Sequence, residues 1–334
     1  MFLLKESKLA KCSLAALIVV IFTFSTFLGV SAYEEETYVA VNNNSTYFHY
    51  QPDYEGARIA AEELGVNFKL QGPAENNVSK MINTLNTVIA QEPDGLMVYG
   101  WSPQLAGPIN KALDAGIPTV TIDADVPGSN ALSFIGSDWH GIGEKLAEEL
   151  ANAIGGEGKV AGFLAPSINI FNYAWEGFTS HIEENYPEIK IVEKIDDEVS
   201  KSKAASKAAA VLQRHPDLAG FAGFDASSGP GIGVALREAN KCGEVKLVSN
   251  DIHMDQLKLL ENGCAQSVIG QNRKAFGYYG VKMLYDYNHT NITYTEKDKE
   301  LGISTIPPRV VTGIIEVTPE NIDAMKKAFS KYEN

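Results

Sequence analysis

The sequence is poor in cysteine and carries no complete catalytic motif. It has three cysteines in 334 residues, and its six histidines are scattered without metal-ligand spacing. The G-x-S-x-G turn of a serine nucleophile is absent. GGEGK (155–159) lacks the P-loop frame, and SGPGIG (228–233) fails as a dinucleotide fingerprint because position 234 is valine. The sequence therefore argues against these enzyme classes and predicts no metal and no organic cofactor.

Basic residues are also scarce. Lysine and arginine number 28 against 42 aspartates and glutamates, which gives a formal net charge of −14 at pH 7. Nucleic acids and anionic membrane surfaces bind proteins through basic patches. We therefore expect neither as a partner, and we expect a monomer.

Long apolar runs are confined to the N-terminus. Three lysines between residues 5 and 11 precede an uncharged run over residues 13–30, and Val30-Ser31-Ala32 has the small residues of a cleavage site. This order is typical of a secretory signal peptide. We predict a cleaved signal peptide over residues 1–32 and a mature chain in the periplasm. The alternative is an uncleaved anchor, because the run approaches the roughly 20 residues that span a bilayer.

After cleavage two cysteines remain, Cys242 and Cys264. An even number of cysteines in an oxidising compartment allows a disulfide. Each cysteine comes just before a predicted strand, and one helix separates the two strands. The alternative is two separate, small buried residues, and the sequence leaves both possibilities open.

The rest of the chain alternates between strand-like and helix-like segments. Apolar residues make up 45% and charged residues 21%, as in a globular protein, and 334 residues are enough for two domains of ordinary size. The predicted strands cover residues 37–42, 67–71, 95–100, 118–123, 159–164, 189–195, 220–224, 246–249 and 265–270. The predicted helices cover residues 53–64, 78–90, 103–116, 142–154, 173–185, 201–214, 231–239, 254–261, 274–287 and 319–329. This alternation predicts an α/β fold with two similar, doubly wound parallel-sheet lobes.

Polar side chains stand where several of these strands end. They are Asp123, Asp125, Asp225, Asp251 and Gln271. Ligands of parallel sheets bind in the crevice beyond the carboxyl ends of the strands. Carboxylate and amide groups there suit a neutral, hydroxyl-rich ligand, because charge-assisted hydrogen bonds are strong. The alternative is that an acid caps the following helix, above all for Asp225, which serines follow.

Two aromatic residues, Tyr50 and Trp101, follow strand ends and are candidate stacking platforms for a sugar ring. The alternative for both is core packing. His49, beside Tyr50, is either a polar ligand contact or a solvated loop residue.

At this point the chain resembles the periplasmic sugar-binding proteins of the ribose-binding type, the solute receptors of ATP-driven importers. The autoinducer-2 receptors belong to the same broad family. The segments that carry the resemblance are FHYQPDYEGARIAAEELG (48–65), AGIPTVTIDAD (115–125), FIGSDWHGIGEKLAEEL (134–150), WEGF (175–178), GFDASSGPGIGVALREA (223–239), VKLVSND (245–251), IGQNRKAFGYYGVKML (269–284) and PENID (319–323). Their order and spacing together are specific.

The resemblance implies a type I periplasmic binding protein, whose two lobes are joined by three hinge crossings. Here the crossings would fall near 137–138, 271–272 and 303–307. The first lobe would comprise residues 33–137 plus 272–304, and the second residues 138–271 plus 305–334. Ligand would bind between the lobes, which would close on it.

The family's ligand-contacting positions also carry over. The residues so implied are His49, Tyr50, Trp101, Asp123, Asp125, Asn172, Asp225, Asp251 and Gln271. Ribose receptors have arginine at the positions of Ala124 and Asn172, so the predicted cleft has no matched lysine or arginine. We therefore expect a neutral sugar or polyol other than ribose, and no anionic ligand.

The function implied is that of a substrate-binding protein that serves the membrane subunits of an ABC importer. The alternative is a receptor that presents a sugar-like signal, including one of the autoinducer-2 type, to a chemoreceptor or sensor kinase. An exported glycosidase with Asp123 and Asp251 as its paired carboxylates is the enzymatic alternative.

Overall fold

The computed structural model describes residues 36–298 and 300–332. The predicted signal peptide, residues 1–32, lies outside the described residues, so its cleavage stays a prediction. Within the described part of the chain, no helix is both long and apolar enough to cross a membrane.

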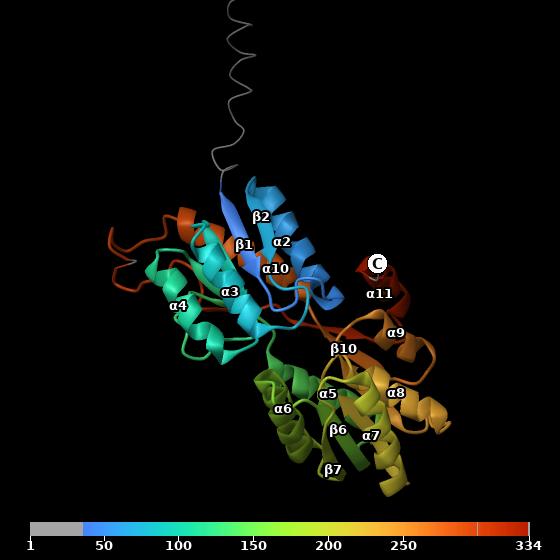
Figure 1. The fold of residues 1–334 in the computed structure, drawn as a ribbon. Coiled ribbons are helices and arrows are strands. Elements are labelled where there is room, and N and C mark those ends of the chain that lie inside the picture. The colour runs from blue at the N-terminus through green and yellow to red at the C-terminus, as the bar shows by residue number, and fades with distance from the viewer. Residues whose placement is uncertain (1–35, 299, 333–334) are drawn as a thin grey trace, which may run out of the picture.

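The molecule has two lobes, each built around a six-stranded sheet (Figure 1). In the first lobe all neighbouring strands are parallel. The order of its sheet is β11 (Arg309–Val311), β5 (Phe134–Gly136), β4 (Thr119–Asp123), β3 (Gly95–Tyr99), β1 (Thr37–Val41) and β2 (Asn67–Gln71). Its helices are α2 (Gln51–Leu64), α3 (Val78–Ile89), α4 (Ala106–Asp114) and α10 (Arg273–His289), with short 3₁₀ turns η1 (Phe48–Tyr50) and η2 (Pro103–Leu105).

The second lobe repeats this arrangement. The order of its sheet is β12 (Ile314–Val317), β10 (Ser267–Gln271), β9 (Lys246–Asn250), β8 (Leu218–Gly223), β6 (Gly158–Leu164) and β7 (Ile189–Asp196). Only the pair β10–β12 is antiparallel. Its helices are α5 (Trp139–Ile154), α6 (Asn169–Asn185), α7 (Lys201–Arg214), α8 (Ser228–Glu238), α9 (Met254–Glu261) and α11 (Ile322–Phe329), followed by η3 (Ser330–Tyr332). The predicted fold class is confirmed, whereas the short strands β5, β11 and β12 were not predicted.

The chain passes between the lobes at three places. It leaves the first sheet between β5 and α5 and returns between β10 and α10, which are the two expected positions. The third passage lies between β11 and β12, at 312–313, and not near 303–307. The expectation was wrong there because β11 pairs with β5 and so keeps residues 309–311 in the first lobe.

Helices α2 and α10 pack with their backbones in close contact, and this contact brings together the ion pair of Arg273 and Asp53. A Cβ atom on Gly277 would lie 1.8 Å from the carbonyl oxygen of Asp53, and one on Gly56 would lie 1.9 Å from that of Lys274. Only glycine fits at such distances. The close packing brings the start of α10, at Arg273, next to Asp53.

Two cysteines of the described chain are joined in the second lobe. Cys242, after α8, and Cys264, before β10, form a disulfide with a Cα–Cα distance of 4.3 Å. The sequence left open a disulfide or two separate buried cysteines, and the structure contains the disulfide.

Candidate ligand-binding site

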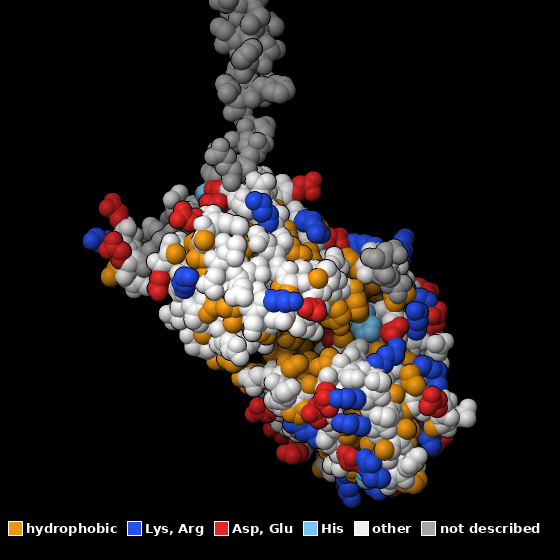
Figure 2. All heavy atoms as spheres, in the orientation of Figure 1, with side chains coloured by type: hydrophobic (Ala, Val, Ile, Leu, Met, Phe, Trp, Pro, Cys, Tyr) orange, Lys and Arg blue, Asp and Glu red, His pale blue; other side chains and the backbone are white. Residues whose placement is uncertain are grey.

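The molecule is hollowed between the two lobes, with apolar side chains along the rim (Figure 2). The hollow contains two cavities, and both lobes contribute to the lining of each. The first cavity, of about 620 Å³, lies between the turn that begins α2 and the loops that follow β8 and β9. The second cavity, of about 570 Å³, lies between the loops after β3 and β4 and the start of α6. Each is large enough for a small ligand.

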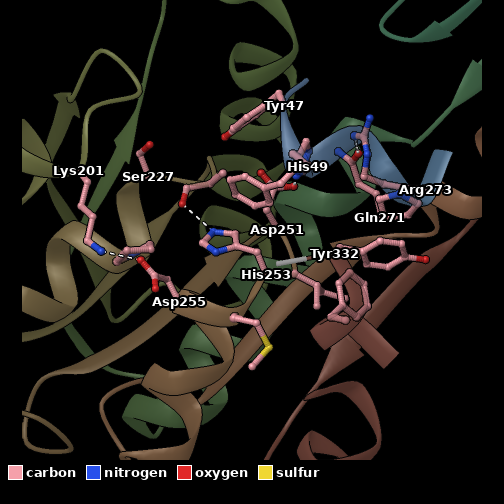
Figure 3. A pocket seen from close by; sticks show the side chains of 17 residues that line it. Tyr47, His49, Lys201, Ser227, Asp251, His253, Asp255, Gln271, Arg273 and Tyr332 are labelled. Carbon is pink, nitrogen blue, oxygen red and sulfur yellow. Dashed lines mark hydrogen bonds and ion pairs between the residues drawn. The ribbon is translucent and has the colours of Figure 1, made fainter. Parts of the chain in front are cut away.

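Asp251 is the central acid of the first cavity (Figure 3). It follows the last residue of β9, its backbone has a φ of 77°, and its side chain is 7% exposed. Its Oδ1 is buried without a hydrogen-bond partner among the described residues. The nearest basic group is His49 Nε2, at 3.9 Å. A buried carboxylate of this kind is costly unless something donates hydrogen bonds to it.

Asp123 is the matching acid of the first lobe, because it ends the strand β4, which is third in its sheet as β9 is in the other. Its φ is 71°. A left-handed backbone is unusual for a non-glycine residue, and such strain concentrates at functional sites. Asp123 itself lies behind the cavity wall, where its Oδ2 accepts hydrogen bonds from Arg273 at 3.1 and 3.2 Å. Its Oδ1 is buried without a partner in the described structure.

Arg273, which the sequence analysis missed, is the most buried basic residue of the cleft; Lys201 also lines the first cavity and Arg309 the second. Its guanidinium is 7% exposed and stands 5.1 Å from the ring centroid of Tyr50. It donates to both carboxylate oxygens of Asp53, at 2.9 and 2.7 Å, to Asp123 Oδ2, and to Gln271 Oε1 at 2.7 Å. The expectation of a cleft without arginine was therefore wrong. Arg273 begins α10 two positions after Gln271, and this place next to a strand-end glutamine was the signal that could have found it.

The aromatic candidates differ in position. Tyr50 is 3% exposed and lines neither cavity; it packs against Tyr99, with ring centroids 5.4 Å apart. Trp101 lines the second cavity, and its Nε1 is buried without a hydrogen-bond partner among the described residues. Core packing thus describes Tyr50, whereas Trp101 stays a candidate for ligand contact.

Two further predicted residues, besides Tyr50 and Asp123, line neither cavity. Asp225 lines neither cavity, since its Oδ1 accepts from the backbone N–H groups of Ser227 and Ser228 at 2.8 and 3.0 Å. It therefore caps α8. Asn172, on α6, donates instead to the carbonyl oxygen of Pro166 at 2.8 Å.

The remaining predicted residues do line the cleft. His49, Asp251 and Gln271 face the first cavity, and Asp125 faces the second beside Trp101. The first cavity also includes residues that the sequence analysis did not single out. Among them are Phe48 and His253, whose rings meet across the cleft with centroids 5.8 Å apart. His253 Nε2 donates to the carbonyl oxygen of Ala226 at 2.9 Å, which fixes its ring.

The buried acids and histidines of the second lobe and the cleft have shifted pKa values. Burial raises the pKa of Asp251 to about 7, and burial together with the neighbouring Asp197 raises that of Asp225 to about 8. Burial lowers the pKa of His49 well below its usual 6.5, and burial also lowers that of His253. The raised acids destabilise the fold as pH rises, and the lowered histidines destabilise it as pH falls.

We expect the stability of the ligand-free protein to fall between pH 6.5 and pH 8. The histidines of the unfolded state lose their remaining protons at the lower end of this window, which opposes the fall only there. Asp251 and Asp225, with pKa values of about 7 and 8, must still lose their protons in the folded state, and together they outweigh that effect. The loss from Asp251 should be of order 1 kcal/mol. Urea unfolding at several pH values measures it, and Asp251→Asn should flatten the slope. A stability that rises over this window would contradict the expectation.

In the described residues, no three histidine, cysteine or acidic side chains are grouped so that they could hold a metal ion.

Comparison with known proteins identifies the family. A family model described as a periplasmic binding protein domain matches residues 37–290. The D-ribose/D-allose-binding protein of Pseudomonas aeruginosa is 26% identical over 88% of this chain and 96% of its own length. The xylose/arabinose-binding protein XylF of Sulfolobus acidocaldarius is 26% identical over 64% of this chain, but the match spans only 54% of XylF.

Two solved structures share the whole architecture. One is a sugar-binding protein of a sugar ABC transporter from Bacillus halodurans, with a TM-score of 0.83 and 30% identity over 87% of this chain and 100% of that chain. The other is AraP, an arabinose-binding protein from Geobacillus stearothermophilus, with a TM-score of 0.80 and 30% identity over 87% of this chain and 99% of that chain. Since the family model covers most of the chain and these structures match it over nearly their full length, the chain belongs to the periplasmic binding protein domain family, as its sequence motifs predicted.

Proposed function

We propose that this chain binds a small, neutral sugar or polyol between its two lobes and delivers it to the membrane subunits of an ABC importer. The single observation that carries the proposal is the Asp251 carboxylate, which lines the first cavity with one buried oxygen that no described residue satisfies. A ligand hydroxyl would supply the missing donor. The names of the relatives support a sugar as that ligand.

The charges of the cleft favour a neutral ligand. A guanidinium has five N–H donors, and Arg273 directs hydrogen bonds to Asp53, Asp123 and Gln271 through all three of its nitrogens. Its positive charge is therefore paired with two carboxylates, and none of its own donors is left for an anionic group. Lys201, which also lines the first cavity, is paired with Asp255 at 2.6 Å. Arg309, in the second cavity, lies 4.3 Å from the ring centroid of Phe134. Asp251, nearby, would repel one.

The proposed ligand set consists of groups on both lobes. It comprises His49, Trp101, Asp125, Asp251 and Gln271. Asp123 supports this set through Arg273. The proposed site of action is the periplasm, because the N-terminal 32 residues have the pattern of a signal peptide.

The mature protein should bind at least one neutral sugar and no phosphorylated one. A thermal-shift screen of D-ribose, D-allose, D-xylose, D-arabinose and polyols, followed by calorimetry on each hit, tests this. D-ribose 5-phosphate is the matched anionic probe. Tight binding of the phosphate, with none for the neutral compounds, would overturn the proposal, because a cationic group of the cleft would then have to bind the phosphate.

A further inference from the structure

Gln271 meets Arg273 in a way that fixes which atoms of its amide face the ligand. The contact is 2.7 Å long and joins Arg273 Nη1 to Gln271 Oε1. Arginine has donors and no acceptor, so the glutamine atom at this contact must be the oxygen. The Nε2 end of the same amide is then left without a hydrogen-bond partner among the described residues, in a side chain that lines the first cavity (Figure 3).

We propose that Arg273 is a positioning residue that sets the hydrogen-bonding pattern of the ligand site. It presents Gln271 to the ligand as a donor, opposite Asp251, which can only accept while ionised. A ligand that fits must accept from one side of the cavity and donate to the other. This inference rests on the proposed function, because it describes how the same cleft distinguishes one sugar from another.

The distribution of the hydrogen bonds of Arg273 distinguishes positioning from plain helix packing. An arginine that only joined α10 to α2 would need Asp53 alone, and two of its hydrogen bonds do go there. The other three go to Gln271 and Asp123, at the carboxyl ends of β10 and β4. One guanidinium therefore joins a strand end of each lobe.

The arginine also occupies a place that the sequence left empty. Ala124 follows Asp123, at the position where ribose receptors carry an arginine, and Arg273 reaches Asp123 from α10 instead. Arg273 Cζ lies 5.1 Å from the ring centroids of both Tyr50 and Phe276, so two aromatic rings pack against the guanidinium. A held guanidinium gives Gln271 one orientation rather than several.

The consequence is selectivity between epimers. Sugars that differ at one carbon present the same hydroxyls in different directions, so a fixed donor and a fixed acceptor can match only one of them well. A glutamine free to turn over could offer either end and would accept both epimers more evenly.

The test uses Arg273→Lys, which keeps a positive charge between Asp53 and Asp123 but loses the planar fork. Lys274→Met is the matched control. Lys274 is the next residue of α10 and also reaches α2, through Glu55 at 3.0 Å, yet it contacts neither Gln271 nor Asp123. If Arg273→Lys does not fold, as judged by circular dichroism, Asp53→Asn with Arg273→Met replaces it, because one charge of each sign is then removed.

The first measurement needs no ligand. Nitrogen-15 NMR of the Gln271 side-chain amide, assigned with Gln271→Glu, should show one pair of signals in the wild type and in Lys274→Met. The pair should shift or broaden in Arg273→Lys. Signals that are the same in all three proteins would overturn the inference.

The second measurement compares affinities for D-ribose, D-xylose and D-arabinose by calorimetry. Arg273→Lys should weaken binding of the preferred pentose about tenfold and bring the three affinities closer together, because Gln271 is no longer held. Lys274→Met should change neither. If the wild type binds none of the neutral sugars, the proposed function fails and the NMR experiment still decides the role of Arg273. If the wild type binds one and Arg273→Lys keeps both affinity and selectivity, the inference alone fails.

Discussion

Asp251→Ala should weaken sugar binding by about 2 kcal/mol or more, roughly thirtyfold in Kd, and leave the fold intact. The reason lies in the free protein. Asp251 Oδ1 is buried without a partner among the described residues, so the carboxylate costs stability until a ligand donates to it. Its removal should therefore leave ligand hydroxyls unpaired in the complex, and should not destabilise the ligand-free protein.

Asp225→Ala is the matched control, because Asp225 follows the neighbouring strand β8 and is equally buried. It caps α8 and lines neither cavity, so its loss should cost about 1 kcal/mol of stability and leave the affinity unchanged. The two variants should thus separate binding from stability. Calorimetry that finds unchanged affinity in both Asp251→Ala and Gln271→Ala would mean that the ligand binds elsewhere.

The sequence predicted the architecture because its longer strands alternate with helices along the chain. Strands β3 and β4 are buried along their whole length, and such runs are distinctive. Strand β11 is three residues long and partly exposed, and β12 is four residues long with only its last residue buried. Their pattern is that of a loop, so the third crossing was placed too early in the chain.

The sequence predicted a site residue correctly where the end of a strand alone fixes its position. It failed where the hydrogen bonds of a side chain determine which way that side chain points. Parallel strands bring Asp251 and Gln271 to one edge whatever their neighbours are. Asp225 also stands at that edge, but the backbone N–H groups of the helix that follows take its carboxylate. Arg273 was not predicted because it begins a helix and does not end a strand. The direction of its side chain depends on the close approach of α2, which brings Asp53 within hydrogen-bonding distance.

The radius of gyration should fall when the sugar found by the screen is added. The proposed ligand groups belong to both lobes, with His49 and Trp101 on the first and Asp251 on the second. A ligand that bonds to both at once gains contacts in a closed arrangement that an open one lacks, and this difference in affinity moves the equilibrium. Three crossings between the lobes allow such a hinge movement.

A contact between the lobes near the C-terminus should be affected by the same closure. Lys331 and Tyr332, which follow α11 of the second lobe, both donate to Glu55 of α2 in the first lobe. A rotation of one lobe against the other must therefore break or rearrange these hydrogen bonds.

Small-angle X-ray scattering of the mature protein with and without the sugar measures closure, and Asp251→Ala at the same sugar concentration is the control that should stay open. A sugar that binds tightly by calorimetry and leaves the radius of gyration of the wild type unchanged would show that this cleft recognises its ligand without closing.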